Sequence, residues 1–201
     1  MKEELKLTYT FDFVHDGQRI FRQLLHAMAN PGQITSIQEE SDKFHDVYAP
    51  LTAIGCTLLD HEESIYVEKN PRLFEELHNL TLCRSGQLTE ADYVFLSSEM
   101  NYGAIEQILK NVKKGTFQDP QDSATMILLC QNLTGTEEMT IEGPGIDGTR
   151  TIQVNPYIKK NMQHRQNLKV EYPLGIDFIF VDCTGQILCF PRLCSITGFI
   201  E

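Results

Sequence analysis

The sequence carries little positive charge, and this argues against one class of partner. It contains 17 Lys and Arg residues against 28 Asp and Glu residues, a formal net charge of −11. The longest basic runs noted are the pairs Lys113-Lys114 and Lys159-Lys160. Because so acidic a surface repels phosphate backbones and anionic membranes, nucleic acid is not expected as a partner. An anionic ligand would have to be held by a few local arginines.

Long apolar runs are also missing. No stretch approaches the 18 or so apolar residues that a membrane helix needs, so no membrane span is expected. The first five residues are not followed by the apolar segment of a secretory signal, which favours a cytoplasmic location. The six cysteines are therefore expected to be reduced thiols that pack as small apolar side chains.

Familiar catalytic and metal-binding patterns are absent as well. The chain has no Gly-x-Ser-x-Gly nucleophile elbow. His61-Glu62-Glu63 lacks the second histidine of a helical zinc site, and Cys183, Cys189 and Cys194 do not form the close tandem pairs of a zinc centre. We expect no bound metal and identify no catalytic residue.

Residues 142–150 contain three glycines with the spacing of a dinucleotide-binding fingerprint. That fingerprint needs a helix after the glycines, so that phosphate meets the helix N-terminus. Residues 151–154 favour a strand instead, and a hairpin turn is the preferred interpretation. Arg150, at the end of this turn, is kept as a candidate contact to a neighbouring segment or an anion.

Apolar periodicity predicts alternating helices and strands along the 201 residues. This pattern predicts a single layered α/β/α domain with a mixed sheet over residues 1–201. Residues 1–14 are expected to form an N-terminal arm, and the polar residues 38–47 a surface loop. Helices are expected at 18–29, 50–59, 70–80, 102–112 and 156–168, and strands at 33–37, 64–68, 93–96, 124–130, 139–141, 151–154, 176–181 and 187–190.

The first helix has Asp16 as its expected N-cap and ends at Asn30-Pro31-Gly32. Its polar face carries Arg22 and His26, which are candidates for an interface or anion contact beside the simpler interpretation of a solvated face. The apolar side chains on its other face are Ile20, Phe21, Leu24, Leu25 and Met28.

A carboxylate at Asp177 begins a strongly apolar strand, where it is costly unless it is paired. Arg192 follows the next strand and is the expected partner, because residues at the ends of a hairpin meet across it. The pair is either a buried structural ion pair or part of a ligand or subunit contact.

Two segments, 21–32 (Phe-Arg-Gln-Leu-Leu-His-Ala-Met-Ala-Asn-Pro-Gly) and 173–177 (Pro-Leu-Gly-Ile-Asp) followed by Pro191-Arg192, make the chain resemble the PhnH family of bacterial carbon–phosphorus lyase subunits. Gly115-Thr116 and residues 141–146 also match family features. The matches run in order from residue 21 to residue 192. The arm and residues 38–47 match least clearly.

The resemblance implies a fold like the large domain of pyridoxal-phosphate-dependent transferases, without the cofactor. It also implies a homodimer when free, and assembly with the G, I and J subunits. With G, I and the L protein, the family supports displacement of adenine from MgATP by a phosphonate, giving a ribose 1-phosphonate 5-triphosphate. MgATP is thus a substrate of the assembly, and the chain alone is not expected to be active.

Two alternatives remain open from the residues. One is an independent transferase-like enzyme, with Arg22, Asp177 and Arg192 around an anion pocket. The other is a homodimeric scaffold without its own ligand.

Overall fold

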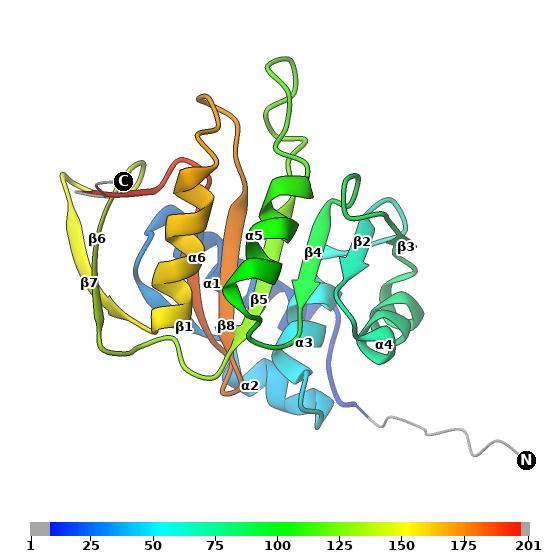
Figure 1. The fold of residues 1–201 in the computed structure, drawn as a ribbon. Coiled ribbons are helices and arrows are strands. Elements are labelled where there is room, and N and C mark those ends of the chain that lie inside the picture. The colour runs from blue at the N-terminus through cyan, green and yellow to red at the C-terminus, as the bar shows by residue number, and fades with distance from the viewer. Residues whose placement is uncertain (1–8, 198–201) are drawn as a thin grey trace, which may run out of the picture.

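The computed structural model describes residues 9–197, and a seven-stranded mixed sheet forms its centre in the order β1-β9-β8-β5-β4-β2-β3 (Figure 1). Strands β8, β5, β4, β2 and β3 are mutually parallel, while β9 runs antiparallel to both of its neighbours. The elements are α1 (His15–Ala29), β1 (Ile34–Ser36), α2 (Gln38–Ser41), the 3₁₀ helix η1 (Asp42–Phe44), α3 (Ala49–Leu58), β2 (Ser64–Val67), α4 (Pro71–Thr81), β3 (Arg84–Ser85), β4 (Tyr93–Leu96), α5 (Tyr102–Asn111), β5 (Thr125–Cys130), β6 (Glu137–Glu142), β7 (Arg150–Val154), α6 (Pro156–Asn167), β8 (Asp177–Asp182), β9 (Gln186–Phe190) and β10 (Ser195–Ile196).

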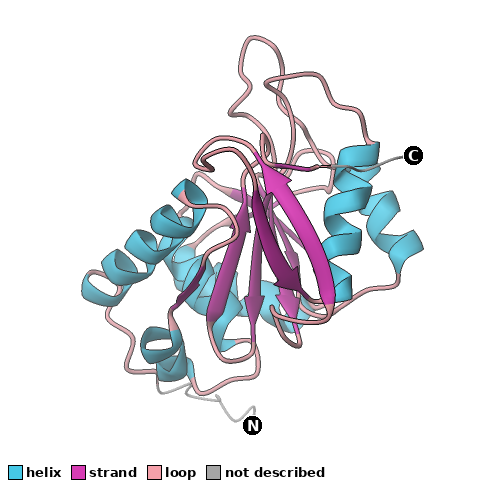
Figure 2. Ribbon diagram, turned by 90° about the vertical axis from the view of Figure 1, so that its left-hand side faces the viewer, coloured by secondary structure: helices cyan, strands magenta, loops and turns pink. Residues whose placement is uncertain are grey.

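Helices cover both faces of the sheet, as Figure 2 shows. Helices α5 and α6 pack on one face, and α1, α3 and α4 pack on the other. Each face of the sheet has its own apolar core. The two cores share one sheet, which confirms the prediction of a layered α/β fold with a mixed sheet.

Strand β5 shows why the central strands read as continuous apolar runs. Met126 and Leu128 point into the core beneath α5 and α6, whereas Ile127 points into the core beneath α1 and α3. A strand covered on both faces needs apolar side chains at every position, unlike a strand with one face in water.

A second, three-stranded antiparallel sheet has the order β10-β6-β7. Its β6–β7 hairpin contains the two strands predicted on either side of the glycine-rich turn. Met139, Ile141 and Val154 extend the core beneath α6, so this sheet is joined to the main one by shared apolar packing.

The prediction of a surface loop at 38–47 is wrong. Residues 38–44 form α2 and η1, and both Glu40 and Phe44 are buried. The polar composition suggested a loop because few apolar side chains, chiefly Ile37 and Phe44, anchor this segment in the core. The described part of the arm packs there too, since the ring of Phe11 lies 4.7 Å from that of Phe44. Residues 1–8 of the predicted arm lie outside the described residues.

The start of α1 also differs from the prediction. Asp16 lies inside the helix and is not its N-cap. The capping carboxylate belongs to Asp12, whose Oδ1 accepts hydrogen bonds from the backbone N–H groups of Val14 and His15, both at 2.9 Å. Asp16 instead pairs with Lys43, whose Nζ lies 2.6 Å from its Oδ2. This bond ties α1 to η1.

Across residues 9–197, the helices are too short or too polar to cross a lipid bilayer. The longest described helix, α1, has 15 residues, fewer than the 18 or so that a membrane span needs.

Candidate functional site

The predicted pair Asp177–Arg192 is present and lies where β8 begins and β9 ends. The backbone N–H of Arg192 donates to Asp177 Oδ1 at 2.7 Å, and Arg192 Nη2 lies 3.3 Å from Asp177 Oδ2. The antiparallel pairing of Phe178 with Phe190 brings the two ends together. Both side chains are mostly buried, so the pair is well shielded from water.

Two further motif segments are joined to this pair by hydrogen bonds. The guanidinium of Arg192 donates to the carbonyl of Pro120, in the loop that Gly115-Thr116 begins. The same loop accepts a hydrogen bond at Lys114 O from the backbone N–H of Gly175, at 3.0 Å. Gly175 has a φ of +154°, and a Cβ there would lie 2.9 Å from the Cβ of Arg192, so only glycine fits without movement.

The remaining motif segments meet beside this point. Arg150 Nη1 donates to the carbonyl of Pro31 at 2.6 Å, which joins β7 to the end of α1. Gly145 has a φ of +84°, and a Cβ there would overlap the carbonyl oxygen of Ala29. In the same turn, the position of a Cβ on Gly143 would be 2.7 Å from the carbonyl of Leu193. We call this meeting of the segments 29–32, 114–120, 143–150, 175–177 and 191–194 the motif junction.

A buried arginine that the sequence does not single out stands next to the motif junction. Arg165 of α6 donates to the carbonyls of Ile176 at 2.9 Å, Phe190 at 2.7 Å and Cys194 at 2.5 Å. Its guanidinium also lies 4.9 Å from the ring centre of Phe178. Burial lowers the pKa of Arg165 to about 10, so the side chain is charged at neutral pH.

Sequence reasoning missed Arg165 because its neighbours gave no signal. It follows His164 in a helix of polar residues whose apolar face is weakly marked. Such a helix is typical of a solvated surface, and only the positions of three distant carbonyls show that one of its charges turns inward.

The other two predicted contact residues lie elsewhere. Arg22 and His26 are exposed on α1, and Arg22 lines a surface groove of about 420 Å³ together with Arg19 and Glu39. Arg192 lines a different cavity. The structure therefore does not bring Arg22, Asp177 and Arg192 into one pocket.

The apolar face predicted for α1 is only partly correct. Ile20 and Leu24 are buried as expected, but Phe21 is 50% exposed and Leu25 is 58% exposed. Val14, just before the helix, is 73% exposed. Positions 14, 21 and 25 fall on one side of the helix because they are separated by seven and four residues. We call Val14, Phe21 and Leu25 the apolar row; Arg22 adjoins it in sequence.

The motif junction lies at the amino ends of β5 and β8. Burial raises the pKa of the Cys194 thiol to about 11, so it is not a thiolate nucleophile. Among residues 9–197 no group of three or more His, Cys, Asp or Glu side chains is placed to hold a metal ion.

The glycine-rich turn lacks the surroundings of a nucleotide site. It joins the antiparallel strands β6 and β7, and no helix begins where the glycines end. The glycines instead allow close backbone contacts to Ala29 and Leu193. The preference for a hairpin turn is confirmed.

Fold and junction together define a layered α/β protein whose sequence motifs fasten its own loops to one another. Residues 10–197 match the family model described as "Bacterial phosphonate metabolism protein (PhnH)", and the chain belongs to this family. A protein of Stutzerimonas stutzeri, named "Putative C-P lyase subunit protein HtxG", is 22% identical over 175 residues, which span 87% of this chain and 83% of that relative. The family places the chain in phosphonate metabolism.

Proposed function

We propose that this chain is a subunit of a carbon–phosphorus lyase assembly that breaks down organophosphonates. The observation that carries the proposal is the family match over residues 10–197, with a relative named as a C-P lyase subunit. A subunit of this kind acts through contact surfaces and needs no catalytic constellation of its own.

The apolar row supports a role in assembly. Exposed apolar side chains are ordinary when scattered, but a row on one helix side, next to charged residues, is typical of an interface. Phe21 and Leu25 would supply the buried centre, and Arg22 would supply a polar rim able to bind a carboxylate in two places. His26, one turn beyond Arg22, belongs to the same proposed contact surface.

The finer biochemical role is part of the same proposal. The assembly would transfer the ribose triphosphate of MgATP to a phosphonate with release of adenine. This chain would work with the G, I, J and L subunits in the cytoplasm, form a homodimer when free, and hold no cofactor. Its likeness to a pyridoxal-phosphate-dependent transferase domain would then be one of fold, with no cofactor chemistry.

The second candidate is an independent transferase-like enzyme. Its proposed pocket needs Arg22 beside Asp177 and Arg192, and these residues line separate surfaces in this structure. The separation favours the subunit, whose contact residues need not converge.

Co-expression with the G, I and J subunits of the same genome tests the proposal. We expect the chain to co-elute with them in a fixed ratio on size exclusion, and to show no turnover of MgATP and phosphonate alone. Assembly of the other subunits without it would contradict the proposal. Turnover by the isolated chain would favour the independent enzyme.

A further inference from the structure

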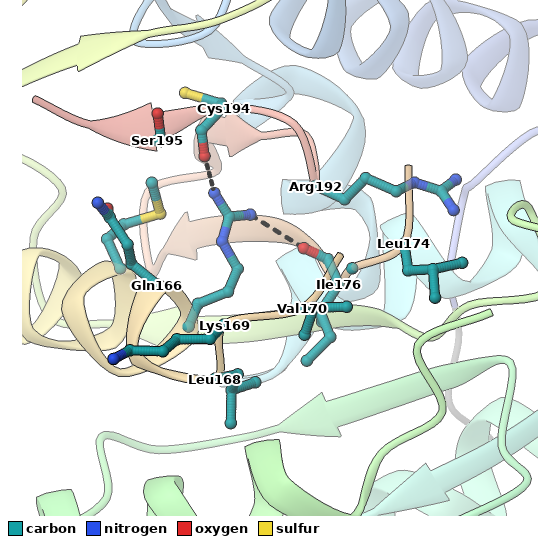
Figure 3. A pocket seen from close by; sticks show the side chains of 12 residues that line it. Gln166, Leu168, Lys169, Val170, Leu174, Ile176, Arg192, Cys194 and Ser195 are labelled. Carbon is teal, nitrogen blue, oxygen red and sulfur yellow. Dashed lines mark hydrogen bonds between the residues drawn. The ribbon is translucent and has the colours of Figure 1, made fainter. Parts of the chain in front are cut away.

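A small cavity opens between the C-terminal end of α6, the segment 168–176 and the segment 191–195. Its volume is about 160 Å³, Arg165 is one of the residues that line it, and Figure 3 shows it from close by. A cavity of about 150 Å³ in another protein holds benzene, a molecule of six heavy atoms. The cavity therefore has room for a ligand of roughly that size.

Arg165 brings a formal positive charge to this cavity without a matching carboxylate. Its exposed fraction is only 8%, and within residues 9–197 no Asp or Glu oxygen lies within 4.0 Å of it. The three carbonyls that it binds offer partial charges only. A buried cation is costly unless an anion offsets it, so this environment favours a negatively charged ligand.

The closest acidic influence on Arg165 is already neutralised. Asp177 acts on it electrostatically but is itself paired with Arg192, whose side chain also lines the cavity. Within the described residues, the Nε–H of Arg165 makes no hydrogen bond, since all of its bonds come from Nη1 and Nη2. Two of its five N–H donors, the Nε–H and one Nη2–H, therefore make no hydrogen bond within the described residues and can serve a ligand.

The rest of the wall combines apolar side chains with polar ones, among them Lys169 and Ser195. Leu168, Val170, Leu174 and Ile176 line it, as Figure 3 shows. Gln166 also lines the cavity, but both ends of its amide are bound to Ile196, so its polarity is used within the fold. Apolar side chains beside a buried charge are typical of a small-molecule site, and their low polarity strengthens the attraction of that charge for an anion.

We propose that this cavity binds a small oxyanion with a short apolar substituent, such as an alkylphosphonate or a short carboxylate. The oxygens face Arg165, and the substituent contacts Leu168 and Val170. The site is separate from the apolar row and does not depend on the proposed assembly.

The test measures binding to the purified full chain by calorimetry at constant ionic strength. The probes are methylphosphonate, inorganic phosphate and acetate at millimolar concentration, so that the phosphorus and carboxylate sources are compared. Val170→Phe fills the cavity without touching the charge of Arg165. Val47→Phe, at an exposed valine away from the cavity, is the matched control.

We expect at least one organic oxyanion to bind, Val170→Phe to weaken it by about tenfold or more, and Val47→Phe to leave it unchanged. Arg165→Gln, if it folds, should abolish binding. The proposal is overturned if no probe binds the unmodified chain, or if binding survives Val170→Phe at full strength. Circular dichroism of Val170→Phe shows that the comparison is made on folded protein.

Discussion

The motif junction and the apolar row use residues from the same sequence motif in opposite ways. At the motif junction, the end of the motif, Ala29 to Gly32, is pressed against the β6–β7 hairpin, and Arg150 holds Pro31 by a hydrogen bond. One to two turns earlier, Phe21 and Leu25 point into solvent. A motif can thus carry two kinds of residue: those that pack the chain's own segments at one end, and those that form the proposed contact surface at the other.

The difference gives contrasting expectations for substitution. Changes at the motif junction should lower the stability of the isolated chain. Changes in the apolar row should leave that stability almost untouched and act only on assembly.

The largest effect is expected for Arg165→Met, beside the motif junction. It leaves three buried carbonyls without a donor, and each such group costs about 1–3 kcal/mol. We expect the free energy of unfolding, measured by urea denaturation, to fall by about 3 kcal/mol or more. Arg22→Met, at an exposed arginine of α1, should change it by less than about 0.5 kcal/mol. Equal effects of the two substitutions would show that the three hydrogen bonds of Arg165 stabilise the fold no more than an exposed arginine does.

Two glycines of one turn offer a matched comparison. Gly145→Ala would place a Cβ against the carbonyl of Ala29, whereas Gly148→Ala meets no atom within 4 Å; both have positive φ. Gly148→Ala should cost only the backbone strain, about 1–2 kcal/mol. Gly145→Ala should cost clearly more, because backbone must also move. Thermal denaturation of both variants measures this, and similar losses would show that the close approach does not matter.

The ion pair of Asp16 with Lys43 predicts a pH dependence. Burial opposes ionisation of Asp16, but the hydrogen bonds from Lys43 and from the backbone of Asp12 outweigh it, so its pKa lies below the ordinary 3.8. A carboxyl with a lowered pKa stabilises the fold above its unfolded pKa and loses that contribution as pH falls. Wild type should therefore exceed Asp16→Asn in stability by about 1 kcal/mol at neutral pH. The gap should close below pH 3.8; a gap independent of pH would exclude this cause.

The layered architecture could be predicted because strong apolar periodicity accompanies burial. Strand β5 and helices α3, α4 and α5 lie close to their expected ranges. The two-residue strands β3 and β10, and the segment α2–η1, were missed because so few apolar residues define them. Such short elements exist through tertiary contacts, which local sequence does not encode.

The candidate site likewise has contacts that the sequence predicts and contacts that it does not. Asp177 and Arg192 could be paired from sequence, because a hairpin fixes which residues face each other. The links from Arg165 to Cys194 and from Arg150 to Pro31 join residues distant in the chain. The exposure of Phe21 and Leu25 was mispredicted because periodicity gives the side of a helix, and not what covers it.

The most direct test of the central claim measures assembly of Leu25→Glu with the co-expressed G, I and J subunits. Leu82→Glu is the control, because Leu82 lies outside the apolar row and its exposed fraction, 66%, is similar to the 58% of Leu25. We predict that Leu25→Glu is as stable as wild type but no longer co-elutes with the partners, whereas Leu82→Glu co-elutes normally. Full assembly of Leu25→Glu would show that the apolar row is not the contact surface.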